Sequence, residues 1–253
     1  MKTPVMNPDS TGTKVSVTDK NNLTGLYNWP RVVAVTGALG SGKTEWCMDF
    51  ADALSFEGSP VLLADMDIIN PYFCLRSVAD KIEHDNLSVL TPPGEISWGD
   101  LTYLNPAIRT RITDASVRIV LDVGGDSQGG LALKQFEPEI EETGYSLHFV
   151  INPFRAHTRT LEEVRVMRRR LESTSGLEVS GVVANAHLGP GTTPADCAKG
   201  AMMVFEFALE LGLEMFYTLA ESDMAEETAT LLPDDIPLWP LRRRIFAPWE
   251  RYE

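Results

Sequence analysis

The chain has 253 residues, 43% of them hydrophobic, which is enough for one large domain built from helices and strands. Its formal net charge of −14 argues against sequence-independent binding to nucleic acid or to anionic membranes, because both would repel it. Its three cysteines form no C-x-x-C pair, and no run has the pattern of a signal peptide or a membrane span, so we expect buried thiols in a cytoplasmic protein.

The first predicted elements surround a glycine-rich motif. Residues 1–25 are polar and without a period, which predicts a mobile tail before a nucleotide-binding domain over 26–240. A strand is expected at 31–36, where the sequence is apolar and β-branched, and a helix at 44–57. Between them lies GALGSGKT, which is G-x-x-x-x-G-K-[ST] in full. Strand, glycine turn and helix together predict a phosphate-binding loop; the alternative is a glycine-rich turn that matches by chance.

Each residue type in this motif has a physical reason. Glycines let successive backbone N–H groups point at phosphate oxygens, and the positive end of the helix dipole favours the same anion. Lys43 supplies a positive charge for the β- and γ-phosphates, and Thr44 offers a hydroxyl to Mg²⁺. We therefore expect the nucleotide to be bound by Gly37, Ala38, Leu39, Gly40, Ser41, Gly42, Lys43, Thr44 and Glu45.

Acidic residues follow the next buried strands. The apolar run at 61–64 ends on Asp65 and Asp67, and the run at 118–121 ends on Asp122. Open α/β sheets bind ligands outside the carboxyl ends of their strands, and carboxylates there can hold Mg²⁺ and its waters. Because side chains two apart share one face of a strand, both carboxylates of the first run are expected in the site. The competing interpretation is that one of them caps the turn that follows.

Strands and helices then alternate to the end of the chain. Further strands are expected at 87–90, 147–151, 179–184, 214–217 and 236–238. Further helices are expected at 72–81, 100–113, 128–142 with a break near Pro138, 157–173, 194–211 and 222–232, with Asp126 or Ser127 capping the third. This alternation predicts a three-layer α/β fold, with a mostly parallel sheet covered by helices on both faces. Aromatic residues among prolines predict a C-terminal docking segment over 241–253.

The order of GALGSGKT, LLADMDIINP, IVLDVGGD and VVANAH resembles the MinD/ParA/nitrogenase-iron-protein class of P-loop NTPases (the SIMIBI class), including the CobQ/CobB-type ATP-binding domain. The resemblance covers about residues 31–238, and a D-x-D-I-x-N-P-Y-F run at 65–73 resembles uncharacterised MinD-like ATP-binding proteins. It implies a switch at Asp65 and Asp67 that meets the γ-phosphate and the attacking water. It also implies a Walker B aspartate at Asp122.

The resemblance implies the remaining site assignments as well. Gly125 would belong to the second switch, and Asn185 would contact the adenine ring. Together with the loop, these residues give a magnesium-dependent ATPase that uses ATP and Mg²⁺. Its expected catalytic residues are Lys43, Asp65, Asp67 and Asp122, and its expected metal ligands are Thr44, Asp67 and Asp122.

Three departures from the class limit what it implies. Ala38 stands where MinD-type loops carry a lysine that reaches across a dimer, so a homodimer around ATP is in question and a slow basal rate is expected. No N-K-x-D follows, so the guanine-specific device is missing. The clustered cysteines or histidines of GTP-dependent metallochaperones and the iron-protein cysteines have no clear counterpart.

Three functions compete at this stage. The first is a switch ATPase that regulates or loads a partner protein, the second a small-molecule kinase or ATP-dependent synthetase with its acceptor near residues 91–100, and the third a non-catalytic regulator; a GTP-dependent metallochaperone is a further alternative. His148 is expected in the core, and His187 beside the base pocket. The arginines at 165–170 are either a solvated face paired with glutamates or a contact surface.

Overall fold

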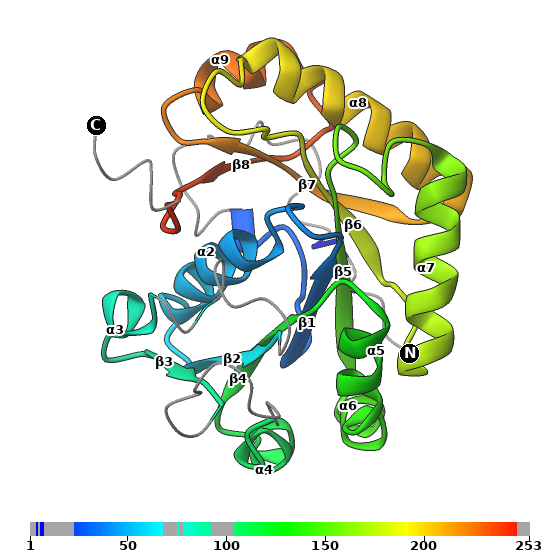
Figure 1. Cartoon of the computed structure of the whole chain (residues 1–253). Helices are drawn as coiled ribbons and strands as arrows, with labels where there is room; N and C mark the ends of the chain where they lie inside the picture. Colours follow the sequence, from blue (N-terminus) through cyan, green and yellow to red (C-terminus); the bar gives the residue numbers. More distant parts are fainter. Residues whose placement is uncertain are drawn as a thin grey trace.

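The computed structural model describes residues 4, 6–7, 23–67, 75, 78–92 and 104–246. Within them, eight strands form one sheet in the order β3-β2-β4-β1-β5-β6-β7-β8, and every neighbouring pair is parallel (Figure 1). The strands are β1 Val32–Gly37, β2 Val61–Met66, β3 Leu87–Leu90, β4 Arg118–Val123, β5 Tyr145–Ile151, β6 Gly181–Asn185, β7 Glu214–Glu221 and β8 Leu238–Leu241. The predicted α/β fold with a parallel sheet is confirmed.

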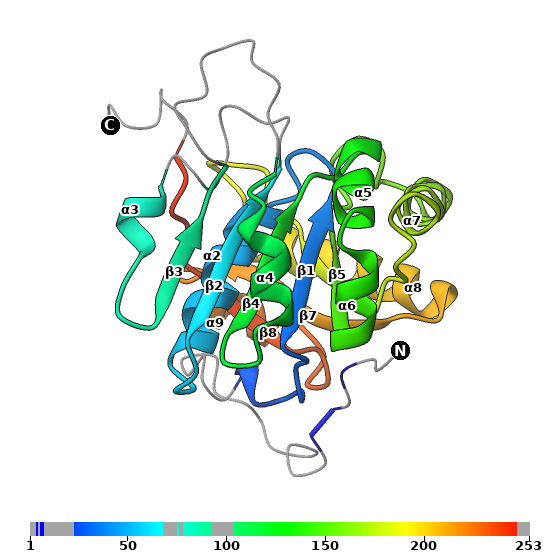
Figure 2. The ribbon, with the colours of Figure 1, turned by 90° about the horizontal axis from the view of Figure 1, so that it is seen from below.

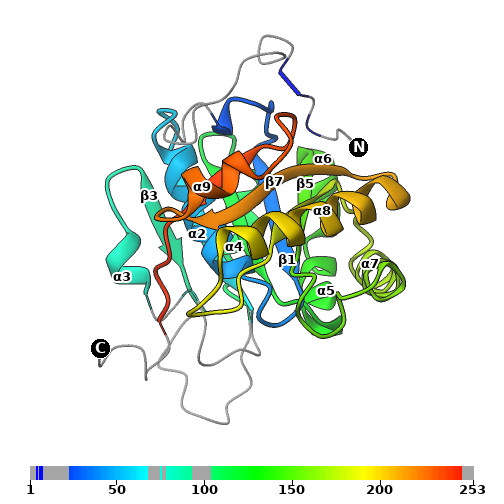
Figure 3. The ribbon, with the colours of Figure 1, turned by 90° about the horizontal axis from the view of Figure 1, so that it is seen from above.

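Helices cover both faces of this sheet. They are α2 Lys43–Ser55, α3 Ala79–Ile82, α4 Ala107–Thr113, α5 Ser127–Lys134, α6 Glu137–Thr143, α7 Leu161–Ser175, α8 Pro194–Leu211 and α9 Ala225–Thr230. One hydrophobic core joins the sheet to α4–α9, and a second joins its other face to α2, α3 and segments near both chain ends. Figure 2 shows α4 and α6 in front of the strands and α2 behind them, and Figure 3 shows α8 and α9 over β7.

The core on the α2 side is unusually aromatic and fixes that helix against the sheet. Trp46 and Phe50 stack at a centroid distance of 4.8 Å, and Trp239 meets Trp46 edge-on at 4.9 Å. Each such pair contributes about 0.5–1.5 kcal/mol beyond the area it buries. His148, fully buried as predicted, accepts a hydrogen bond from Trp46, and burial lowers the pKa of its imidazole to about 3. The helix that carries Lys43 is therefore held rigidly.

Several helix boundaries differ from the prediction for local reasons. The expected helix at 128–142 is two helices, and Pro138 lies in the first turn of the second, where a missing N–H costs nothing. The helix expected from His157 begins only at Leu161, because Thr160 and Glu163 form a capping box. The described part of the helix expected at 100–113 begins after Pro106.

The chain ends also differ from the sequence prediction. Leu23 and Thr24, assigned to the tail, are buried, and the Tyr217 hydroxyl donates to the Leu23 carbonyl at 2.6 Å. Leu241 belongs to β8, so the predicted boundary after residue 240 falls inside a strand. Most of the D-x-D-I-x-N-P-Y-F run, Cys74, the acceptor segment at 93–100 and residues 247–253 lie outside the described residues. Among the described residues, no helix has the length and apolarity needed to cross a membrane.

Candidate nucleotide site

The phosphate-binding loop, residues 37–44, leaves β1 at Gly37 and enters α2 at Lys43. Gly40 and Gly42 have φ angles of 74° and 87°, a left-handed conformation that glycine adopts without strain. A Cβ on Gly42 would lie 2.1 Å from the Asn185 Nδ2 atom, so a side chain there would displace Asn185. The first N–H groups of α2 lack acceptors within the helix, so they and the helix dipole form an anion site beside the loop.

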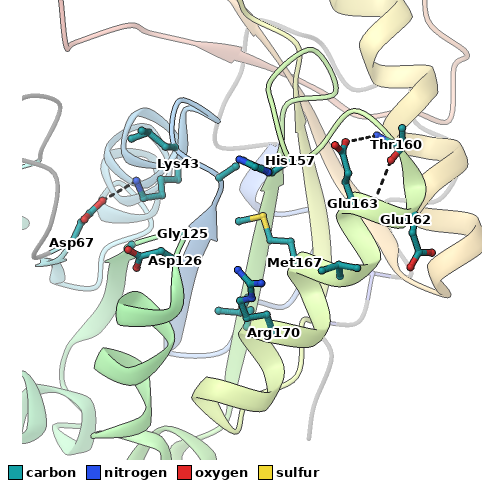
Figure 4. A pocket seen from close by; sticks show the side chains of 15 residues that line it. Lys43, Asp67, Gly125, Asp126, His157, Thr160, Glu162, Glu163, Met167 and Arg170 are labelled. Carbon is teal, nitrogen blue, oxygen red and sulfur yellow. Dashed lines mark hydrogen bonds and ion pairs between the residues drawn. The ribbon is translucent and has the colours of Figure 1, made fainter.

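The loop lysine is paired with an aspartate from the end of β2. Lys43 Nζ lies 2.9 Å from Asp67 Oδ2, and both side chains are almost fully buried. Burial lowers the pKa of the Lys43 ammonium, but the carboxylates of Asp122 and Asp67 outweigh it and raise the pKa above its ordinary value. A Cβ built on Gly124 would lie 3.3 Å from Asp67 Oδ1. Asp67 therefore connects the lysine to the loop after β4 (Figure 4).

Asp122 lies in β4, opposite Asp65 in β2, and is fully buried. Burial raises the pKa of its carboxyl to about 6, although the charge of Lys43 lowers it. The Thr44 hydroxyl lies close enough to this carboxylate to lower its pKa as well, and the Cys47 thiol donates to Oδ1 at 3.5 Å. Within the described residues, Asp122 Oδ2 has no hydrogen-bond partner.

The oxygen atoms at this position suit Mg²⁺, and the predicted ligands Thr44, Asp67 and Asp122 stay a prediction. A buried carboxylate oxygen without a donor, next to a threonine hydroxyl, offers the oxygen ligands that Mg²⁺ prefers. No group of three His, Cys, Asp or Glu side chains among the described residues is placed to hold a metal ion. Magnesium in nucleotide sites commonly takes only one or two protein ligands and completes its shell with water and phosphate.

Asp65 and Asp67 occupy different positions, because β2 continues to Met66. Asp65 is buried within the strand, and its Oδ1 accepts a hydrogen bond from the Asp67 N–H at 3.1 Å. Asp67 lies just beyond the strand and reaches Lys43. Asp65 therefore holds the backbone of Asp67, and Asp67 faces the loop lysine. The carboxylates of both residues raise the pKa of Asp122, and their predicted roles at the site stay predictions.

The loop after β4 packs directly on the phosphate-binding loop. A Cβ on Gly125 would lie 1.8 Å from the Gly37 carbonyl oxygen, so no larger residue fits without moving the backbone. The Thr36 hydroxyl donates to the Gly124 carbonyl at 3.3 Å. Asp126 then caps α5, as one of the two predicted candidates, and accepts hydrogen bonds from two N–H groups at 3.0 Å. Asp67, the phosphate-binding loop and the loop after β4 are thus packed together, so movement of one of them changes its contacts with the others.

Asn185 is the last residue of β6 and contacts the phosphate-binding loop. Its Nδ2 donates to the Ser41 carbonyl at 2.7 Å, and its Oδ1 accepts from the His187 N–H at 3.3 Å. A carboxamide retains one further donor hydrogen and one further lone pair, so the predicted adenine contact stays a prediction. His187 Nε2 lies 2.9 Å from Glu221 Oε1 at the end of β7, which places a carboxylate near the same strand ends.

The side chain of Glu45 points to another part of the molecule. Its carboxylate accepts hydrogen bonds from the Arg244 N–H at 2.9 Å and the Ile245 N–H at 2.6 Å. Burial raises the pKa of Glu45 to about 7, while these N–H groups and the charge of Arg244 lower it. Only its backbone N–H, in the first turn of α2, is left for the predicted contact with a nucleotide. No pattern of neighbouring residues indicated this pairing.

Two residues of the loop between β5 and α7 lie near the phosphate-binding loop and were not among the predicted site residues. Arg155, in the loop between β5 and α7, has its Nε 3.7 Å from a Cβ built on Gly40. His157 in the same loop has a φ of 69°, which a non-glycine residue rarely adopts. His157 and Arg170 also line a cavity of about 930 Å³ between the phosphate-binding loop and α7 (Figure 4). Arg155 and His157 follow the carboxyl end of β5, and that position was the available signal.

No protein-family model matches the chain, and no curated protein matches it. Among solved structures it is similar to cell division protein FtsY from Thermotoga maritima, at 18% identity and a TM-score of 0.48 over 74% of this chain and 60% of that chain. It is also similar to the signal recognition particle 54 kDa protein from Aeropyrum pernix in complex with GDP, at 16% identity, a TM-score of 0.49, and coverage of 75% and 41%.

The kinase domain of Escherichia coli tyrosine kinase ETK is similar at 16% identity and a TM-score of 0.40, with 64% of this chain and 69% of that domain covered. The chain thus spans less than two thirds of the length of the first two proteins. These likenesses concern the fold alone, and none of them identifies the nucleotide or the reaction.

Proposed function

We propose that this protein binds Mg²⁺·ATP at residues 37–44, hydrolyses it, and uses the cycle as a conformational switch that acts on a partner protein. The observation that carries the proposal is the buried ion pair between Lys43 and Asp67 at 2.9 Å. The lysine of such a loop serves the β- and γ-phosphates, so a bound triphosphate competes with Asp67 for the same ammonium group.

This competition supplies the switch. When Lys43 turns to phosphate, Asp67 loses its cation and is free to act at the phosphate end of the site. Asp67 also lies against Gly124, and Gly125 lies against the Gly37 carbonyl, so the change is passed to the loop before α5. A local change of charge that biases two packed arrangements is how nucleotide switches work in general.

The other residues have supporting roles in this proposal. Thr44 and Asp122 would hold Mg²⁺, with Asp67 as a further ligand. The ion would supply charge neutralisation for phosphoryl transfer when it is bound. Asp67 would orient the attacking water, and Asp65 would hold the Asp67 backbone through its hydrogen bond. The amide of Asn185, which holds the loop through Ser41, would favour adenine over guanine.

A second function is favoured by one observation. The cavity of about 930 Å³ is lined by both Lys43 and Asp67, and the acceptor of a phosphoryl group would lie in it. A small-molecule kinase or ATP-dependent synthetase would use this space for its second substrate.

Turnover separates these functions. Purified protein in molar excess over Mg²⁺·ATP should convert the nucleotide to ADP and phosphate in a single turnover without any added acceptor, and chelation of Mg²⁺ should stop it. Loss of ATP only when an acceptor is supplied would establish the kinase or synthetase instead. Tight binding with no loss of ATP under either condition would leave a non-catalytic regulator.

A further inference from the structure

The cavity beside Lys43 adjoins the phosphate end of the nucleotide site and extends away from it toward α7. Of the phosphate-binding loop it contacts only Ala38, Leu39 and Lys43, and it does not include Asn185. Its far wall is the first three turns of α7, which face the loop and Asp126 across the space (Figure 4). Its volume of about 930 Å³ is within the range of small-molecule sites. The two sites meet at the Lys43–Asp67 pair.

Apolar side chains on both walls are exposed to this space. Leu39, at the tip of the phosphate-binding loop, is 77% exposed, and Val166 on α7 is 47% exposed. Met167 and Leu171 on the same helix complete the apolar lining. Apolar residues that gather in a hollow, rather than scatter singly, mark a binding surface, because covering them removes apolar area from water.

The charged groups in the cavity are not equally available. Glu163 is occupied by the capping box of α7, Asp126 caps α5, and Glu162 pairs with Arg165 at 2.8 Å. Arg170 lines the cavity one turn beyond Val166 and Met167, and within the described chain its guanidinium has no hydrogen bond or ion pair. Arg170 is therefore the charged side chain of the lining that stays available to a ligand within the described chain.

We propose that this cavity binds a small amphipathic anion. Its apolar or aromatic body would lie on Leu39, Val166 and Met167, and its single anionic group, whether carboxylate, phosphate or sulfonate, would pair with Arg170. Such a ligand would contact the Lys43–Asp67 pair and so act on the proposed function as its second substrate or effector. The binding itself requires neither ATP nor hydrolysis, so the two proposals fail separately.

Two fluorescent probes test this site. 8-Anilinonaphthalene-1-sulfonate carries an aromatic body and a sulfonate, and N-phenyl-1-naphthylamine has the same body without the charge. The first should bind the whole protein saturably at one site, and the second more weakly. Arg170→Gln should weaken the anionic probe about tenfold, the value of one charge-assisted contact, and leave the neutral probe unchanged. Arg169→Gln, an exposed neighbour that does not line the cavity, is the matched control.

Val166→Asp should weaken both probes, because it places a carboxylate in the apolar wall, while circular dichroism reports whether the variant folds. Saturating Mg²⁺·ATP should leave the anionic probe bound. Equal losses in Arg170→Gln and Arg169→Gln, or competitive displacement by Mg²⁺·ATP, would overturn the proposal. So would a concentration-dependent doubling of mass that Val166→Asp abolishes and that excludes the probes, since the face would then belong to a second copy of the chain.

Discussion

Helix α2 carries two clusters of charge that differ in how completely they are satisfied. On one side, Glu45, Asp49 and Asp52 share a helix face and bind the segment after β8. Arg244 donates to Asp49 at 2.5 Å and to Asp52 at 2.6 Å, and the Trp239 indole donates to Asp49 at 2.8 Å. On this side, each of the three carboxylates has donors.

The other cluster surrounds the start of the same helix. Lys43 holds Asp67, but the buried Asp122 Oδ2 atom has no hydrogen-bond partner within the described residues. A buried polar atom without a partner costs free energy, so it is expected where a ligand or ion completes the set. The C-terminal cluster is therefore built for stability, and the Lys43 cluster for binding. Variants in the two should therefore separate stability from nucleotide affinity.

Lys43→Ala is expected to have the largest effect. It removes the charge that faces the phosphates, so ATP should bind at least about tenfold more weakly, or about 1.4 kcal/mol. It also leaves Asp67 buried without its cation, which should cost about 3 kcal/mol of unfolding free energy. Calorimetry with Mg²⁺·ATP and urea unfolding measure the two effects.

The double variant Lys43→Ala, Asp67→Asn separates these effects. Removing the second charge should restore most of the unfolding free energy but none of the ATP affinity. An ATP affinity that is unchanged in Lys43→Ala would contradict the assignment of the phosphate-binding loop.

Asp67→Asn preserves shape and removes the carboxylate that meets Lys43. Hydrolysis should fall by about 10² or more, the range expected for a positioned acid–base group. ATP affinity should not weaken, because the lysine loses a competitor. Single-turnover kinetics with excess protein measure the rate, and Asp80→Asn on the exposed face of α3 is the control. Hydrolysis as fast as in the parent protein would make Asp67 a structural residue and remove the main support for the switch.

Arg244→Gln tests the C-terminal cluster. Asp49 would keep donors from Trp239 and from the Arg242 N–H, so the expected loss of unfolding free energy is about 2 kcal/mol, less than for an unpaired buried charge. Affinity for Mg²⁺·ATP should not change. Arg243→Gln is the neighbouring control, since that guanidinium lies over the Phe246 ring. A parallel loss of ATP affinity in Arg244→Gln would show that the two clusters are coupled.

Base preference is the smallest expected effect. ATP should bind about tenfold better than GTP, a difference of about 1.4 kcal/mol, in a competition assay. Asn185→Ala should weaken both nucleotides, because the amide also holds the Ser41 carbonyl. If the amide contacts the base, the ratio of the two affinities should fall as well. A ratio that stays constant, or a preference for GTP in the parent protein, would leave Asn185 with the loop contact alone.

Local sequence determined much of the architecture. The glycines and lysine of the loop, the β-branched strand before it and the caps of α8 are properties of neighbouring residues, so their effects are visible in the chain itself. The helix predicted at 194–211 has the bounds observed for α8, between the Thr193 cap and Gly212. Strand ends were less accurate, because Asp65 and Asp122 look like loop residues and enter the sheet only through burial beside their neighbours.

Tertiary structure alone decided which side chains meet. Glu45 follows the loop in sequence, yet it binds an N–H 199 residues away, and Asp65 and Asp67 have different partners although they are two residues apart. The cavity likewise depends on the packing of α7 against the phosphate-binding loop. Periodicity and propensity act over a few residues, whereas the partner of a buried charge is set by where the sheet and its helices bring distant residues together.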